Sequence, residues 1–131
     1  MIGVKDVTLT ILEKGLDALS ARQAAIANNL ANVETPNYKA VDVAFEASLR
    51  KALQEDAALV QAGPDRAAAQ LEQVEPRLFR RNDISMRLDG NNVDVETEMV
   101  RMAETATRYQ ALTTLATRKL ALLRMVAREG R

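Results

Sequence analysis

Apolar side chains recur at helical spacing near the start of the chain. The intervals between them alternate between three and four residues, and only Gln23 interrupts the stripe. This heptad-like spacing predicts a long helix over residues 1–33 with a narrow apolar face. The face consists of Leu9, Leu12, Leu16, Leu19, Gln23, Ile26, Leu30 and Val33.

A second stripe predicts a C-terminal helix over residues 93–131. It has the same alternating intervals and one polar interruption, Thr113. Asp94 suits the N-cap, Glu96 and Glu98 suit the first turn, and basic residues crowd the last turns, as the helix dipole favours. Further leucines widen the stripe, so we expect this helix to contact more than one neighbour. The stripe comprises Val95, Met99, Met102, Ala106, Tyr109, Thr113, Ala116, Leu120, Leu123 and Ala127, widened by Leu112, Leu115, Leu122 and Val126.

The two stripes together favour a mostly α fold. We expect the terminal helices to form an antiparallel, coiled-coil-like pair within one domain. If Val33 lies near Val95, then Gln23 lies opposite Thr105. Between the two helices, residues 34–92 are expected to form a loop-rich, partly extended centre.

Residues 34–92 carry weaker signals. Mostly helical spacing predicts a short middle helix capped by Asp42. Residues 54–76, which contain Gly63-Pro64 and Pro76, indicate an exposed loop or a marginal helix. Alternation at positions 84, 86 and 88 predicts a short strand before a turn at "DGNN". The apolar positions of the middle helix are Val41, Phe45, Leu49, Ala52 and Leu53, and those of the strand are Ile84, Met86 and Leu88.

The stretch "IANNLANVETPNYKA" predicts an abrupt end to the first helix. Pro36 disfavours helical backbone at the residue before it, and asparagine tolerates turn conformations, so the helix should end near Asn32. Asparagine is common near helix ends, but this density of amides also suits hydrogen bonds to neighbouring backbone groups. The motif comprises Asn28, Asn29, Asn32, Thr35, Pro36, Asn37 and Tyr38.

Composition narrows the function classes. Aromatic residues are 3% of the chain, so aliphatic helix seams must supply the core. Basic and acidic residues balance at 18 each, which makes nucleic acid an unexpected partner. The chain has no histidine and no cysteine, and it shows no phosphate loop or nucleophile motif, so we expect no cofactor, no metal site and no catalysis. We also expect neither a cleaved signal peptide nor a membrane span.

Two function classes stay open from the residues alone. A self-contained helical bundle acting as an adaptor explains both apolar stripes without any assembly, and periodicity by itself favours it. An enzyme of unknown type needs a pocket, which this composition gives little reason to expect.

Two segments resemble the flagellar axial proteins of bacteria, the family of rod and hook subunits. They are "RQAAIANNLANVETPNYKAVDVAFE" at residues 22–46 and "DGNNVDVETEMVRMAETATRYQALTTLATRKLALLRMV" at residues 89–126. Asn37 stands where hook and distal rod proteins have glycine, and Ala111 follows Tyr109-Gln110 where those have asparagine. On both points, and in its short length, the sequence resembles the proximal rod branch of the family.

The resemblance implies a structural rod subunit that polymerises through its terminal helices into the drive shaft. The implied partners are copies of itself, other rod proteins, the adaptor that joins the rod to the MS ring and export gate, and the type III export apparatus. The implied location is the periplasmic rod of the basal body. In such an assembly the expected interface residues are Leu9, Leu12, Leu16, Leu19, Gln23, Ile26, Leu30, Met99, Met102, Tyr109, Leu112, Leu120 and Leu123. The asparagines at the helix end are then expected to act as hydrogen-bonding joints at a subunit boundary, so that Asn32→Leu harms assembly more than Asn91→Ala.

Overall fold

A computed structural model of the chain describes residues 6–59, 63–85 and 87–130, with the side chains of residues 55–59 left out. The element order is α1 (Val7–Ala31), β1 (Val41–Ala44), α2 (Glu46–Leu59), α3 (Pro64–Glu72), β2 (Arg77–Arg80) and α4 (Val95–Glu129). The predicted mostly α fold is therefore confirmed. None of the described helices is both long and apolar enough to cross a membrane.

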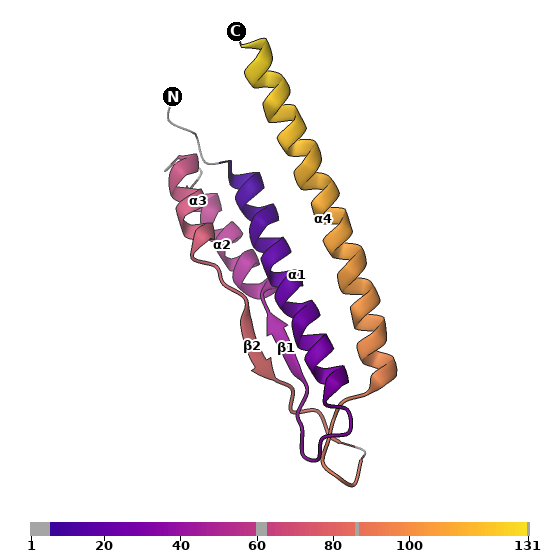
Figure 1. Ribbon diagram of the computed structural model, residues 1–131. Coiled ribbons are helices and arrows are strands. Elements are labelled where there is room, and N and C mark those ends of the chain that lie inside the picture. Colours follow the sequence, from indigo (N-terminus) through magenta and orange to yellow (C-terminus); the bar gives the residue numbers. More distant parts are fainter. Residues whose placement is uncertain (1–5, 60–62, 86, 131) are drawn as a thin grey trace.

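The two terminal helices pack against each other in antiparallel orientation (Figure 1). Lys119 near the end of α4 forms an ion pair of 3.1 Å with Asp6 at the start of α1. Gln23 and Thr105 line a shared hollow of about 310 Å³ between the helices, which confirms the predicted register. The pairing thus places the end of α1 beside the beginning of α4.

Helix α1 begins and ends where its local chemistry requires. The Asp6 carboxylate caps the start by accepting the backbone N–H groups of Thr8 and Leu9. The helix ends at Ala31 with Asn32 as its C-cap, close to the predicted position. Asn37 adopts a left-handed φ of 60° in the following turn, which asparagine tolerates better than most residues. The abrupt stop read from the sequence is confirmed.

The predicted start of the middle helix was wrong. Residues 41–44 form strand β1, which pairs antiparallel with β2 so that Val43 faces Leu78. Asp42 therefore does not cap a helix, and α2 starts at Glu46 instead. The physical reason is alternation: Val43 and Phe45 are buried in the core and Val41 packs against it, while Asp42, between Val41 and Val43, points to arginine side chains.

Part of residues 54–76, expected as an exposed loop or a marginal helix, forms helix α3. Gly63 is its N-cap and Pro64 its first residue, where proline is well tolerated. The helix is less exposed than expected, because it packs against α1 and buries Ala67, Ala68 and Leu71. The strand expected at residues 84–88 is wrong for the residues described there, because β2 lies earlier. Met86 itself falls outside the described residues.

Helix α4 extends well beyond the start of α1 (Figure 1). Asp94 caps it by accepting the backbone N–H groups of Glu96 and Thr97, as predicted. Only Glu98 and Thr105 are buried along its length. Most of the predicted apolar stripe of α4 consequently faces solvent in the isolated chain.

Candidate assembly site

Asn29 lies at the centre of a buried polar joint near the end of α1. Its side-chain amide donates to the carbonyl oxygen of Val41 over 2.8 Å and to a carboxylate oxygen of Glu98 over 3.0 Å. Its side-chain oxygen accepts the backbone N–H of Val41 over 2.8 Å and the hydroxyl of Tyr38 over 3.1 Å. Both donors and both acceptor positions of the amide are therefore used, and the side chain ties α1, β1 and α4 together.

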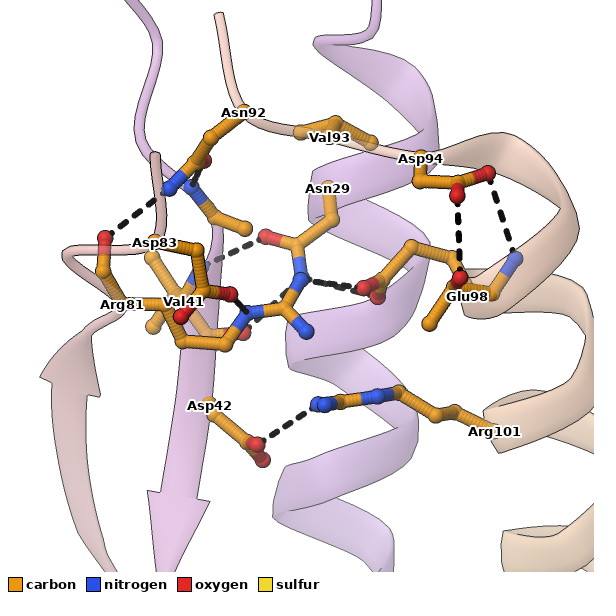
Figure 2. Close-up of polar contacts among 12 residues, drawn as sticks. Asn29, Val41, Asp42, Arg81, Asp83, Asn92, Val93, Asp94, Glu98 and Arg101 are labelled. Atoms are coloured by element: carbon orange, nitrogen blue, oxygen red, sulfur yellow. Dashed lines mark hydrogen bonds and ion pairs between the residues drawn. The ribbon is translucent and has the colours of Figure 1, made fainter. Parts of the chain in front are cut away.

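Glu98 and Arg81 form a buried ion pair in the same joint (Figure 2). Glu98 is fully buried, and Arg81 is 9% exposed. The Arg81 side chain comes from the segment that follows β2, so the pair links this segment to the first turn of α4. Taking both charges out of water is costly, and the pair is tolerated because Asn29 donates a further hydrogen bond to the carboxylate.

Asn91 forms a second joint directly under the end of α1. Its side-chain amide donates to the carbonyl oxygens of Asn32 over 2.9 Å, of Val33 over 3.1 Å and of Thr35 over 2.9 Å. Its side-chain oxygen accepts the backbone N–H of Val93 over 2.8 Å. Backbone carbonyl groups in a turn need donors from elsewhere in the chain, and here a fully buried asparagine supplies them to the turn that follows α1.

Asn92 fastens the two strands at the same end. Its side-chain oxygen accepts the backbone N–H of Ala40 over 2.6 Å, and its amide donates to the carbonyl oxygen of Arg81 over 3.0 Å. The backbone N–H of Arg81 in turn donates to the carbonyl oxygen of Ala40 over 2.8 Å. The "DGNN" segment is thus more than a turn, because its side chains hydrogen-bond to the end of the α1 region and to the residues that flank both strands.

The predicted helix-end motif divides into buried and exposed members. Asn29 is buried and Tyr38 is half-buried, whereas Asn28, Thr35, Pro36 and Asn37 are exposed and Asn32 is intermediate. Asn32 donates only to its neighbour Asn28, at the carbonyl oxygen over 2.8 Å and at the side-chain oxygen over 3.2 Å. Hydrogen-bonding joints are therefore present within the chain, and the side chain of Asn91 bonds across the chain whereas the amide group of Asn32 bonds within its own helix turn. The expectation that Asn32→Leu harms assembly more than Asn91→Ala stays a prediction.

Further arginine–carboxylate pairs lie beside the joint. Arg22 on α1 makes a two-pronged contact with Glu46 over 2.6 and 2.9 Å and also donates to the carbonyl oxygen of Val43. Arg101 on α4 reaches Asp42 over 2.7 Å. The hydrogen bond from Arg22 lowers the pKa of Glu46, and burial together with the charge of Glu98 raises the pKa of Tyr38.

The predicted interface residues of α1 are largely used inside the chain. Leu12, Leu19 and Ile26 are buried, and Leu9, Leu16, Gln23 and Leu30 are intermediate. On α4 the distribution is the opposite, because most predicted positions stay exposed. There, Met102 and Leu112 are intermediate, whereas Met99, Tyr109, Leu120 and Leu123 are exposed. The predicted positions that the single chain leaves exposed therefore lie mainly on α4.

An apolar groove lies between α1, α2 and α4. Its volume is about 320 Å³, and its floor includes Ile11, Leu12, Ala18, Phe45, Leu49 and Leu112. Gly15 also lines it, and a side chain added there would meet the end of Leu112 at 2.8 Å. The missing side chain of Gly15 is what allows α4 to approach α1 closely at this level.

The sequence patterns do not single out the most buried polar residues. Glu98 is explained at sequence level by the dipole of α4, Arg81 lies in an unassigned stretch, and Asn91 is read as part of a turn. For only one of these buried polar residues does the sequence contain a pattern that predicts its burial. Asn29 belongs to the asparagine cluster at a position whose helical spacing from Ile26 predicts burial. No spacing rule indicates that Glu98 and Arg81 should meet.

Comparison with known proteins identifies a protein class that agrees with the fold. Residues 9–39 match the family described as "Flagella basal body rod protein". The class of protein that the paired terminal helices and the matched segment define is therefore the flagellar rod subunit.

Relatives narrow this class to one protein family. The flagellar basal body rod protein FlgB of Bacillus subtilis (strain 168) is 33% identical over 126 residues, with 95% of both chains covered. FlgB of Escherichia coli (strain K12) is 32% identical, covering 84% of this chain and 85% of that protein, and FlgB of Cereibacter sphaeroides is 32% identical with 99% of each covered. The chain belongs to the FlgB family of flagellar basal body rod proteins.

Proposed function

We propose that this protein is a structural subunit of the flagellar basal body rod and assembles there with other rod components. Its membership of the FlgB family supports this role most directly. The long exposed apolar face of α4 supports it independently, because a chain that acts alone gains nothing from leaving such a face in water.

At finer detail, we infer that the subunit polymerises through its terminal helices into the proximal part of the drive shaft, which transmits torque and encloses the export channel. Contacts with copies of itself, with other rod proteins and with the adaptor and export gate at the MS ring belong to this proposal. So does export by the flagellar type III apparatus into the periplasm without a cleaved signal. Covering one exposed leucine of α4 with a neighbour contributes roughly 1.5 to 3 kcal/mol, so several such contacts hold a shaft together.

A structural role is favoured over catalysis by the way the polar groups are used. The one buried carboxylate of α4, Glu98, is already neutralised by Arg81 and bonded by Asn29. Among the described residues, no three acidic, histidine or cysteine side chains gather to hold a metal ion. The polar centre therefore acts as a joint between segments.

The location of the protein tests the proposal. We expect an epitope-tagged chain that restores motility to a deletion strain to co-purify with basal bodies stripped of hook and filament. A tagged outer filament subunit, removed by the same treatment, is the matched control. A tagged chain that stays in the soluble fraction as a monomer, in cells that swim normally, would contradict the rod assignment and favour the self-contained helical adaptor.

A further inference from the structure

Strand β2 has an open edge, whereas the opposite edge of the same small sheet is covered. Among the described residues the sheet contains only β1 and β2, and β1 lies between β2 and α1 (Figure 1). Side chains of α1 occupy the backbone groups that β1 turns toward it. Asn29 bonds both the N–H and the carbonyl oxygen of Val41. Arg22 donates to the carbonyl oxygen of Val43, so the edge of β1 is satisfied within the chain.

The register of the two strands shows which backbone groups of β2 face outward. In an antiparallel pair, residues whose N–H and carbonyl groups point to the partner strand alternate with residues whose groups point away from it. Val41 and Val43 turn these groups toward α1. Their partners in β2 are Arg80 and Leu78, which therefore turn theirs to the outer side of the sheet. Within the described part of the chain these outward groups make no hydrogen bond.

The side chains of β2 are exposed as well. Leu78 is 62% exposed and Phe79 is 44% exposed, although both belong to a strand. Arg77 and Arg80 flank them at the two ends of β2 and are also exposed. An edge strand with unpaired backbone groups and uncovered apolar side chains is a surface on which another extended chain can pair.

This edge carries uncompensated positive charge. Arg77 and Arg80 form no ion pair among the described residues. The nearest carboxylates along the chain are Glu75, which is also unpaired, and Asp83, which lies beside a buried arginine. Asp42, across the sheet from Phe79, is held by arginines of α1 and α4. The two arginines of β2 are therefore free to meet acidic groups from outside the chain.

We propose that β2 accepts an extended segment of another protein as a third strand, and that this segment reads acidic–apolar–apolar–acidic. The outward N–H and carbonyl groups of Leu78 and Arg80 supply the backbone hydrogen bonds. Directly opposed side chains in a sheet interact, so the order Arg-Leu-Phe-Arg at residues 77–80 is matched by a carboxylate, two apolar groups and a carboxylate. The proposal extends the assembly role proposed above to a surface outside the terminal helices.

A second copy of this chain fits the edge less well. Pairing β2 with β2 gathers the arginines of both copies in one narrow sheet and supplies no carboxylate from either strand, so like charges repel. The sequence also contains no acidic–apolar–apolar–acidic run elsewhere. The occupant that the edge favours is therefore a segment of a different protein.

A synthetic peptide tests the proposal with the purified full chain. The probe is Thr-Thr-Glu-Val-Val-Glu-Thr-Thr with blocked ends, added at low salt while the amide NMR signals of the chain are followed. We expect the shifts to centre on β2 and hydrogen exchange at the N–H groups of Leu78 and Arg80 to slow about tenfold when they become bonded. The same peptide with lysine in place of glutamate is the matched control and should bind about tenfold more weakly.

Variants of β2 separate the backbone contribution from the charge contribution. Leu78→Pro removes an outward N–H and leaves the bonds between β1 and β2 in place, a position at which an edge strand tolerates proline. Leu78→Ala keeps this N–H, and the proline variant should bind about fivefold more weakly than it does. Arg77→Glu combined with Arg80→Glu changes only exposed, unpaired side chains, so the chain stays folded and the preference should reverse to the lysine peptide.

Several results would overturn the proposal. These are an absence of shifts in β2 with the glutamate peptide, equal binding of the two peptides, equal affinities of Leu78→Pro and Leu78→Ala, or an unchanged preference after charge reversal. Slow exchange at Leu78 without peptide, together with dimers in sedimentation, would show that β2 pairs with a second copy and would also overturn it. Because the test uses purified protein and a defined peptide, each of these results leaves the rod assignment intact.

Discussion

Asn29 and Glu98 are joined by a buried hydrogen bond of 3.0 Å although 69 positions separate them in the chain. This contact fixes the end of α1 against the first turn of α4, and Arg81 completes it from a third segment. A joint of three segments converts two long helices, which could otherwise slide along a repetitive apolar seam, into a pair with one register. Buried polar groups are well suited to setting register because a shifted pairing leaves them unsatisfied.

Glu98→Gln is expected to destabilise the folded chain strongly. The substitution keeps the shape but leaves the buried guanidinium of Arg81 with only the exposed carboxylate of Asp83, 3.9 Å away, as counter-charge. Breaking a buried ion pair by removing one partner costs roughly 3 to 5 kcal/mol. Urea unfolding followed by circular dichroism measures the change. Glu96→Gln, two residues earlier and exposed, is the matched control and should stay within about 0.5 kcal/mol of the unchanged chain. Equal midpoints for the two variants would show that the pair contributes nothing.

Asn91→Ala is expected to destabilise the chain more than Asn32→Leu does. The alanine removes one donor from three carbonyl groups in the turn after α1. It also leaves the buried backbone N–H of Val93 without its acceptor, and a buried unsatisfied group costs about 1 to 3 kcal/mol. Asn32 donates only within its own helix turn, so its loss is milder. Asn82→Ala, at an exposed position, serves as control. If Asn32→Leu unfolds at the lower urea concentration, the assignment of Asn91 as the joint is wrong.

Gly15→Val is expected to push α4 away from α1. The new side chain meets the end of Leu112, and overpacking of this kind costs about 1 to 3 kcal/mol. Adding Leu112→Ala should recover much of that loss, because it frees the space that the valine needs. A double-mutant cycle of unfolding free energies measures the coupling. Strictly additive effects would mean that the two positions do not touch.

Acid should weaken the fold partly through Glu46. The two-pronged hydrogen bond from Arg22 lowers the pKa of this carboxyl below its usual value near 4.3. A carboxyl whose pKa is lowered by folding contributes stability that is present above the usual value and is lost as the pH falls through the lowered one. Carbon-detected NMR titration reads this pKa directly.

Arg22→Gln provides the control for that titration. Without the guanidinium, the pKa of Glu46 should return toward its ordinary value, and stability should change less steeply below about pH 4.3. A Glu46 carboxyl that titrates at its usual value in the unchanged chain would contradict the contact.

Leu123→Asp is expected to abolish rod assembly while leaving the chain folded. The position is 40% exposed in the single chain, so the carboxylate stays hydrated until a neighbour covers it, when its desolvation costs several kcal/mol. Secretion should continue, and swimming in soft agar should stop. Leu12→Asp is the contrasting variant, because Leu12 is buried and its replacement should unfold the chain itself. Normal swimming with Leu123→Asp would remove this face from the assembly surface.

The sequence by itself determines the two long helices, the N-cap of α4 and the abrupt end of α1. These features depend on contacts between residues a few positions apart, such as the cap from Asp94 or the effect of Pro36 on its neighbour. Such local contacts can be predicted from the order of the residues alone. The register of the pair is also predictable, because the limits of the two apolar stripes align their ends. The burial of each stripe is less predictable. The stripe of α1 is covered from several sides, whereas most of the stripe of α4 is exposed to solvent.

Only the tertiary structure decides the strands and the polar joint. Whether residues 41–44 become strand or helix depends on whether an edge such as β2 is available, and no spacing within the segment can reveal that edge. The meeting of Asn29, Arg81 and Glu98 likewise depends on three segments arriving at one place. A buried charge is tolerated only where its hydrogen-bonding and charged partners converge. Which charged residues form such a site is therefore decided by the tertiary packing that removes them from water.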